Sequence, residues 1–254
     1  MTADEVHKMA AVEASHWWYV GTREICLSLL LPHLDCSRPL RILDIGCGTG
    51  GNMAELVRLG PARGIDLDPL CVDYTRRRGL ECSLGDMLDF DAPPASLDLI
   101  TFFDVATHLG RDPFPAVLKR AATALAPGGV LAFREPAMPI ARGSHDRAVD
   151  VRHRFTASDV RQCLKEAGFE PLRITYLNTV LFPPIVLLRQ LQNLLAPARA
   201  VSDVRPTREP LNTMLLSLLR IEKKLLRFID LPFGVSLFAV ARKREGYARS
   251  ATMA

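Results

Sequence analysis

The sequence predicts an α/β fold built on a mostly parallel sheet, and three observations lead to that class. Short apolar runs alternate with stretches of helical spacing between residues 41 and 133, as in strands joined by crossover helices. A glycine-rich turn follows the first run, where a strand would pass into a helix. The run at residues 97–103 is apolar enough to be buried on both faces, which is typical of parallel sheets.

The individual elements follow from local pattern. Strands are predicted at residues 41–45, 62–66, 80–84, 97–103 and 130–133, with helices between them at residues 52–59, 69–78 and 114–125. Residues 135–155 are expected to form a polar loop. A capped helix should then begin after Thr156 or Ser158 and end at Gly168. A sixth strand is predicted at residues 171–177, and a seventh, antiparallel one at residues 235–242.

Five segments are expected along the chain: an N-terminal helical lid (1–36), the sheet core (37–176), a helical insert or cap (177–232), the last core strand (233–243) and a C-terminal tail (244–254). The insert is long for a connection between two strands. It contains helical apolar spacing at residues 185–195 and 211–229, joined by a linker at residues 196–210. The second of these helices should place Leu211, Leu215, Leu218, Leu219, Leu225 and Leu226 near one stripe. The insert could be a plain subdomain, a roof over a ligand, a dimer face or a membrane-surface patch.

Composition excludes several classes of protein. The 254 residues are 48% hydrophobic and 24% charged, which is enough apolar surface for a core and excludes general disorder. The net charge of +4 is too small to argue for nucleic-acid binding. None of the six cysteines has Cys-x-x-Cys spacing, and no signal peptide or membrane-spanning run is recognised. A cytoplasmic protein with reduced thiols is expected.

Three polar motifs follow successive predicted strands. Asp44 precedes the turn Gly46-Cys47-Gly48-Thr49-Gly50, where glycines would let a ligand approach the backbone at a helix N-terminus. Asp66 lies twenty residues after Gly46, where a carboxylate would accept hydrogen bonds from ribose hydroxyls. Asp86 could accept an adenine amino hydrogen, with Met87 packed on the base. The carboxyl ends of parallel strands meet at one edge, so these motifs predict a single crevice.

These motifs resemble the sequential motifs of class I S-adenosylmethionine-dependent methyltransferases. The likeness extends through Gly64-Ile65-Asp66-Leu67-Asp68-Pro69 and Leu125-Ala126-Pro127-Gly128-Gly129, and covers residues 41–135. Segments at residues 13–19, 144–156 and 231–237 resemble one bacterial branch of the family. The resemblance implies a Rossmann-like seven-stranded sheet in the order 3-2-1-4-5-7-6 with helices on both faces, and S-adenosylmethionine as the cofactor.

The resemblance also assigns roles to residues. The methionine part of the cofactor would lie over Gly46, Gly48 and Gly50. Asp44 would orient the turn or contact the amino group of the cofactor. Asp66 would hold the ribose, while Phe103 or Asp104 would sit beside the methionine part. The expected cofactor-binding set is Asp44, Gly46, Cys47, Gly48, Gly50, Asp66, Leu67, Asp86, Met87, Phe103 and Asp104. Cys47 is interpreted as a small residue in a tight turn rather than as a nucleophile.

A dehydrogenase-type nucleotide site is the alternative interpretation of the glycines. A phosphate-cradling Gly-x-Gly-x-x-Gly motif needs a glycine at position 51, and Gly51 is present, so the glycines alone do not decide. Asp86 and the run at residues 125–129 favour the methyl donor.

The catalytic residues are less clearly marked. His108, His145 and His153 are candidates for a general base or an acceptor contact, since an ordinary histidine can take a proton near neutral pH. Their structural alternatives are a histidine that caps a helix and a charged loop held by surface ion pairs. If residues 104–108 are helical, Asp104 and His108 share one face, but with Thr107 they are a poor ligand set, so no metal is expected.

Two further groups of residues have open roles. The arginines between residues 142 and 154 could bind a carboxylate or phosphate on the acceptor. Trp17 and Trp18 could belong to a lid over the ligands or anchor the first helices on the core.

The sequence therefore predicts a methyltransferase acting on a small-molecule acceptor, apolar or carrying an anionic group, at oxygen, nitrogen or carbon. A role in a biosynthetic pathway is compatible with this prediction. A methyltransferase for protein or RNA, and a non-catalytic cofactor-binding protein of the same fold, are the alternatives. The sequence does not decide between a monomer and a homodimer.

Overall fold

The computed structural model describes residues 2–110, 112–196 and 200–244. Its seven strands form one sheet in the order β3-β2-β1-β4-β5-β7-β6, which confirms the predicted fold class and order. The strands are β1 (Ile42–Ile45), β2 (Ala62–Asp66), β3 (Glu81–Leu84), β4 (Leu97–Phe103), β5 (Leu125–Pro136), β6 (Phe169–Leu177) and β7 (Ser236–Lys243). The strands from β3 to β5 pair in parallel, and β7 runs antiparallel to both of its neighbours.

Helices α1, α2, α4 and α7 begin at a residue whose side chain caps the first turn. Asp68 precedes Pro69, and its carboxylate accepts from the Leu70 N–H. The Thr156 hydroxyl accepts from the Asp159 N–H. The α-helices are α1 (Ala3–Val12), α2 (Trp17–Leu30), α3 (Met53–Leu56), α4 (Pro69–Arg77), α5 (Phe114–Ala124), α6 (Ser144–Ala148), α7 (Ala157–Glu166), α8 (Phe182–Leu195) and α9 (Leu211–Leu225). Short 3₁₀ turns are η1 (Leu31–His33), η2 (Ala106–His108) and η3 (Pro139–Ala141).

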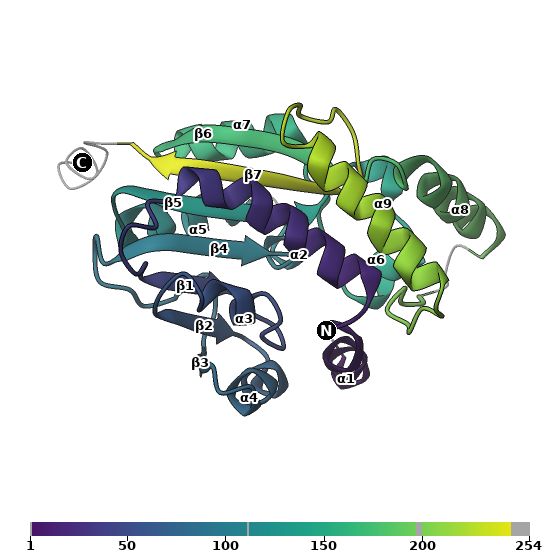
Figure 1. Ribbon diagram of the computed structural model, residues 1–254, viewed down its shortest axis with the longest axis horizontal. Coiled ribbons are helices and arrows are strands. Elements are labelled where there is room, and N and C mark those ends of the chain that lie inside the picture. Colours follow the sequence, from purple (N-terminus) through teal and green to yellow (C-terminus); the bar gives the residue numbers. More distant parts are fainter. Residues whose placement is uncertain (1, 111, 197–199, 245–254) are drawn as a thin grey trace.

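Two apolar clusters sandwich the sheet. Because side chains alternate along a strand, Ile42 belongs to one cluster and its neighbour Leu43 to the other. Buried residues of α2, α3 and α9 join the cluster of Ile42, and those of α5 and α7 join the cluster of Leu43. Figure 1 shows α2 and α9 on one face of the sheet, with α5 and α7 behind it. Helices therefore cover both faces, as predicted.

The N-terminal helices and the insert form one layer. Gly21 of α2 lies so close to α9 that an added Cβ would be 2.4 Å from Leu219 Cδ1. The Asn212 amide joins the two segments, since its oxygen accepts from the Trp17 N–H (2.8 Å) and its nitrogen donates to the Ser15 carbonyl (3.1 Å). Trp17 packs against the core from this layer, which supports the anchoring role for the first tryptophan.

The predicted leucine stripe of the second insert helix is wrong in detail. Leu219 and Leu226 are buried, whereas Leu211 and Leu225 are 47% and 45% exposed. The prediction placed them on one stripe because all are apolar, but only the inward leucines reach the core. In the described part of the chain, no helix is both long and apolar enough to cross a membrane.

Two other local predictions need correction. Residues 104–108 are not one helix, because Asp104 has a φ of 58° and the 3₁₀ turn η2 begins only at Ala106. Residues 135–155 are not simply a loop, since β5 continues to Pro136 and α6 forms within the segment. The strand was predicted to end at residue 133 because the apolar run stops at the charged residue Arg134.

Candidate functional site

The glycine turn after β1 has the backbone that the motif anticipates. Gly46, Gly48 and Gly50 have φ values of +70°, +57° and +87°, a region that disfavours other L-residues. An added Cβ on Gly46 would also lie 2.2 Å from Val105, which follows β4. On Gly48, by contrast, an added Cβ would meet only the Met9 methyl, at 3.4 Å. The turn thus brings bare backbone to the edge where β1 and β4 separate.

Asp66, at the end of β2, braces this turn. Its carboxylate accepts from the Gly48 N–H (2.8 Å) and from the Asp68 N–H (2.9 Å). Burial raises the pKa of this carboxyl, and the two N–H groups oppose the rise. Three more amides of the turn also donate within the protein: those of Gly46 and Cys47 to the Ile65 carbonyl, and that of Gly50 to the Cys47 carbonyl. The Asp66 carboxylate keeps lone pairs for further donors.

Asp44 is buried in β1, two residues before the glycine turn. The Thr101 hydroxyl donates to its Oδ1 (2.5 Å), while Oδ2 has no hydrogen-bond partner. Burial raises the pKa of Asp44 to about 7. A buried acceptor without a donor costs free energy, so this oxygen suits a ligand that brings a donor.

Three more of the predicted cofactor residues, Leu67, Asp86 and Met87, follow β2 and β3. The Asp86 carboxylate accepts from the Leu88 N–H (2.9 Å), which fixes the bend after β3. Met87 is partly buried against the core, and the neighbouring Leu67 side chain is 69% exposed. All three residues follow the ends of β2 and β3, so the topology places them at the same edge as the glycine turn.

Phe103, the last residue of β4, and Asp104, which follows it, both meet Arg134 of β5. The buried Arg134 guanidinium donates to the Asp104 carboxylate (Nε to Oδ1, 3.2 Å) and lies over the Phe103 ring, 5.4 Å from its centroid. The predicted contact of Asp104 with a ligand therefore competes with an internal ion pair. The sequence did not indicate Arg134, although a charge that ends an apolar strand is a usable signal.

The next residue of β5, Glu135, is a second omission. Its fully buried carboxylate accepts from three successive N–H groups, those of Val105, Ala106 and Thr107, at 2.8–3.0 Å. Burial raises the pKa of Glu135, and the nearby Asp104 charge adds to that rise. Glu135 thus fixes the segment after β4, in which His108 lies.

Cys47 lies inside the glycine turn, as expected of a small residue. Its Sγ is 3.4 Å from the Cys82 Sγ of β3, and both residues are buried. The hydrogen bond with Cys82 and burial together raise the pKa of Cys47. A thiol held protonated is a poor nucleophile, which supports the packing role.

Glu13 is the most consequential residue that the site prediction missed. Its carboxylate accepts from the Thr49 hydroxyl (2.5 Å) and from Arg78. An added Cβ on Gly51 would lie 2.1 Å from Glu13 Oε2, so position 51 must remain bare for this contact. The contact with Glu13 thus explains why residue 51 is a glycine, without any role in binding phosphate. Glu13 opens the segment quoted above as typical of one branch, which was the available signal.

The three predicted catalytic histidines differ in their surroundings. His108 Nδ1 is 2.9 Å from the Asp150 carbonyl, which can only accept, so Nδ1 carries the proton and Nε2 keeps a lone pair. His145 Nδ1 accepts from the Asp203 N–H (3.1 Å), so in the neutral ring Nε2 is protonated. Burial also lowers the pKa of His145.

His153 packs edge-on against the Phe155 ring at 4.7 Å. Its backbone exchanges hydrogen bonds with Thr107, so it lies beside η2 and the segment of His108. The structure therefore brings His108 and His153 together, while His145 contacts the linker of the insert.

The charges of the 142–155 segment are mostly used internally. Arg154 forms a buried ion pair with Asp146 (2.8 Å), Arg142 donates to the Arg152 carbonyl, and Arg147 donates to the Asn193 side chain. The proposed binding of an anionic acceptor by these arginines has no support from this arrangement. In the ranges that the structure describes, no group of three or more His, Cys, Asp or Glu could hold a metal ion.

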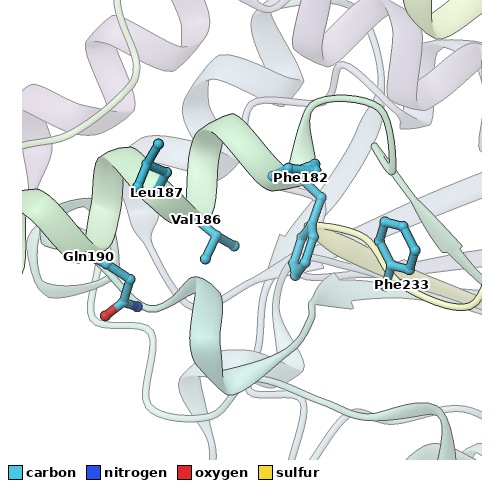
Figure 2. Close-up of a pocket in the computed structure, with 6 residues that line it drawn as sticks. Phe182, Val186, Leu187, Gln190 and Phe233 are labelled. Atoms are coloured by element: carbon cyan, nitrogen blue, oxygen red, sulfur yellow. The ribbon is translucent and has the colours of Figure 1, made fainter.

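A separate apolar hollow lies on the insert. Its volume is about 430 Å³, and it is lined by Phe182, Pro183, Val186, Leu187, Gln190 and Phe233. Figure 2 shows Phe182 of α8 and Phe233, which precedes β7, with their rings side by side at one end. None of these residues belongs to the predicted cofactor or catalytic set.

Comparisons with known proteins agree with the fold and identify the family. A family model described as a methyltransferase domain matches residues 19–174, more than half of the chain, so the chain belongs to that family. The fold is also that of solved methyltransferases. An S-adenosylmethionine-dependent methyltransferase from Mesorhizobium loti is similar with a TM-score of 0.56 and 19% identity, over 85% of this chain and 96% of that one. The resemblance to class I S-adenosylmethionine-dependent methyltransferases is thereby confirmed.

A second solved relative contains the cofactor. Phosphoethanolamine N-methyltransferase 2 of Haemonchus contortus, in complex with S-adenosyl-L-methionine, is similar with a TM-score of 0.58 and 17% identity, over 87% of this chain and 52% of that one. Among curated proteins, the ubiquinone biosynthesis O-methyltransferase of Xanthomonas campestris pv. campestris is 34% identical over 142 residues, which are 50% of this chain and 58% of that protein. The matches thus span little more than half of that relative.

Proposed function

We propose that the chain transfers a methyl group from S-adenosylmethionine to an oxygen, nitrogen or carbon atom of a small-molecule acceptor. The observation that supports this proposal most is the union, at one edge of the sheet, of a bare glycine turn, the Asp66 carboxylate and the unpartnered Asp44 oxygen. The family membership and the relatives named above, which act in ubiquinone biosynthesis or on phosphoethanolamine by their names, favour a small acceptor.

The residues at this edge of the sheet fit the cofactor. The unpartnered Asp44 oxygen would accept from the amino group of the methionine part, and the open face of Gly48 would lie beneath that part. Asp66 would hold the ribose hydroxyls with its remaining lone pairs, and Asp86 and Met87 would contact the adenine. When bound, the cofactor supplies an electrophilic methyl group on a sulfonium.

The chain then has three tasks: to hold both reactants in line, to exclude water and to remove a proton where the acceptor carries one. His108 suits the last task, because the Asp150 carbonyl fixes its tautomer and leaves the Nε2 lone pair available. Glu135 would position this histidine by holding the backbone of η2. His153 would contact the acceptor from beside the same turn, and His145 is the weakest of the three candidates for a base.

Calorimetry with S-adenosylhomocysteine tests the site. Asp66→Ala should weaken binding by about 1.5–3 kcal/mol, the range for a hydrogen bond to a charged group. Asp73→Ala, which removes an exposed carboxylate from α4, is the matched control and should leave the dissociation constant unchanged. An unaltered constant for Asp66→Ala would remove that residue from the site, and binding of NAD in place of both methionine nucleosides would overturn the proposal.

A transfer assay tests the acceptor. Methyl-labelled S-adenosylmethionine is incubated with phenols, amines and hydroxyl-bearing lipids, and His108→Gln should lower turnover with little change in cofactor binding. Failure of every acceptor, with cofactor binding intact, would favour the non-catalytic alternative. Label found only in added RNA or protein would favour the macromolecular one.

A further inference from the structure

The outward side of α9 carries an apolar surface that the fold leaves uncovered. We call Met214, Ile221, Leu225, Phe228 and Ile229 the outer stripe. These side chains are 54%, 63%, 45%, 84% and 48% exposed, respectively. The first three are seven and four residues apart along the helix, which places them on one face, and the last two follow the end of the helix.

The outer stripe is distinct from the side of α9 that packs on the core. Leu219 and Leu226 are buried against the sheet and α2, and they account for the attachment of the helix. In Figure 1, α9 runs beside α2 at the outside of the molecule. Packing among the described residues therefore explains one apolar side of α9 and leaves the other uncovered by them.

Charge identifies the kind of occupant. Lys224 and Arg227 are exposed beside the outer stripe, and neither forms an ion pair with the described residues. The other two cations of this helix, Arg220 and Lys223, are both paired with Glu24. The uncompensated charge beside the stripe is therefore positive.

The nearby acidic groups do not cancel that charge. Asp230 is paired with Arg173 (2.7 Å). Glu222 is buried and accepts from the Asn178 and Thr179 N–H groups (2.5 and 2.9 Å). An apolar ridge flanked by cations thus remains on the surface.

We propose that the outer stripe, with Lys224 and Arg227, docks the protein on an anionic lipid bilayer, with α9 lying in the plane of the interface. Aliphatic and aromatic side chains would enter the boundary of headgroups and acyl chains, while the lysine and arginine reach the lipid phosphates. A symmetric dimer through the same stripe would bring these unpaired cations of two copies together, so charge favours the bilayer over a second copy.

The neighbouring helix α8 adds apolar surface from the same insert. Its one buried residue is Arg189, whose guanidinium donates to the Ala141 carbonyl (2.6 Å) and to Asp203 (3.0 Å). Its leucines point outward instead, and five are 47–81% exposed: Leu187, Leu188, Leu191, Leu194 and Leu195. Because α8 buries an arginine and exposes its leucines, the insert exposes more apolar surface than α9 alone.

Co-sedimentation with vesicles tests the proposal on the full chain. Vesicles of phosphatidylcholine alone are compared with vesicles of equal parts phosphatidylcholine and phosphatidylglycerol. The wild-type protein should bind the anionic vesicles, and added salt should weaken that binding. Lys224→Gln with Arg227→Gln should lower the partition coefficient about tenfold or more, and Phe228→Ser should lower it as well.

Matched variants control for net charge and for folding. Arg161→Gln with Lys165→Gln removes two exposed cations from α7 on the opposite face and should leave vesicle binding unchanged. Leu31→Ser serves the same purpose for Phe228→Ser, since Leu31 is 41% exposed in η1. Circular dichroism confirms the fold of each variant.

Three outcomes would overturn the proposal: no binding to anionic vesicles, equal loss in the α7 control, or a wild-type dimer that Phe228→Ser dissociates without any vesicle binding. Vesicle binding needs no methyl transfer, so this proposal and the proposed function can fail separately.

Discussion

At the scale of single residues, the candidate site depends on carboxylates placed at the ends of buried strands. Asp44 and Asp66 lie near the ends of neighbouring parallel strands, but their surroundings differ. Asp66 is braced by two N–H groups, whereas Asp44 receives one hydroxyl and keeps an oxygen without a donor. The second arrangement stores a free-energy cost that a cationic ligand group would relieve.

The raised pKa of Asp44 makes stability depend on pH. Burial places this pKa at about 7 in the folded protein, against about 4 in an unfolded chain. Between these values the folded state binds more protons than the unfolded state, so stability falls as pH rises through the window. The contribution of Asp44 to stability is complete below about pH 4. Above pH 7 it is smaller by about 4 kcal/mol, at about 1.4 kcal/mol for each pH unit.

Asp44→Asn should remove this dependence because an amide does not titrate. Urea unfolding of the variant and the wild type, from about pH 5 to about pH 8, should show the variant gaining relative stability as pH rises. Asp73→Asn, at an exposed position of α4, should run parallel to the wild type. If the stability curves of Asp44→Asn and the wild type run parallel over this pH range, the raised pKa of Asp44 is contradicted.

At the scale of elements, the strands and capped helices were predictable and the joints between elements were not. The β2 and β4 strands have the predicted bounds. β4 is a largely apolar run, and β2 is a short segment between the turn signals Gly60-Pro61 and Asp68-Pro69. The segment after β4 was missed because its shape is imposed by Glu135 from the next strand, a contact between residues about thirty positions apart. Local pattern contains no information about such a brace.

Gly21 shows the same limit for helix packing. A glycine inside a helix costs about 0.5–1 kcal/mol relative to alanine, and spacing alone gives no reason for it. The structure supplies one, since Leu219 of α9 occupies the space where a Cβ would lie.

A double-mutant cycle tests this contact. Gly21→Ala should destabilise the wild type by about 1–3 kcal/mol through overpacking. In a Leu219→Ala background the same change should be neutral or stabilising, because the space is then free and the helix propensity improves. Equal effects of Gly21→Ala in both backgrounds, measured by urea unfolding, would show that the two helices do not meet at this point.

At the scale of the whole molecule, the N-terminal helices connect the helical layer to the candidate cofactor site. Asn212 and Glu24 tie α2 to the insert, and Glu13 ties the joint of α1 and α2 to the glycine turn. The fold class and strand order were predictable because they follow from the family resemblance, whose motifs lie within residues 41–135. This connection was not, because it joins segments that have no pattern in common.

Glu13 is therefore expected to couple cofactor binding to the order of α1. Glu13→Ala removes the acceptor of the Thr49 hydroxyl and leaves the half-buried Arg78 without its carboxylate. Affinity for S-adenosylhomocysteine should fall about tenfold or more, and amide hydrogen exchange in residues 3–12 should become faster. Asp4→Ala removes an exposed carboxylate, paired with Lys8 on α1, and should leave the affinity unchanged. If Glu13→Ala accelerates exchange in α1 but leaves the affinity unchanged, the N-terminal helices are an attachment to the sheet and have no part in holding the cofactor.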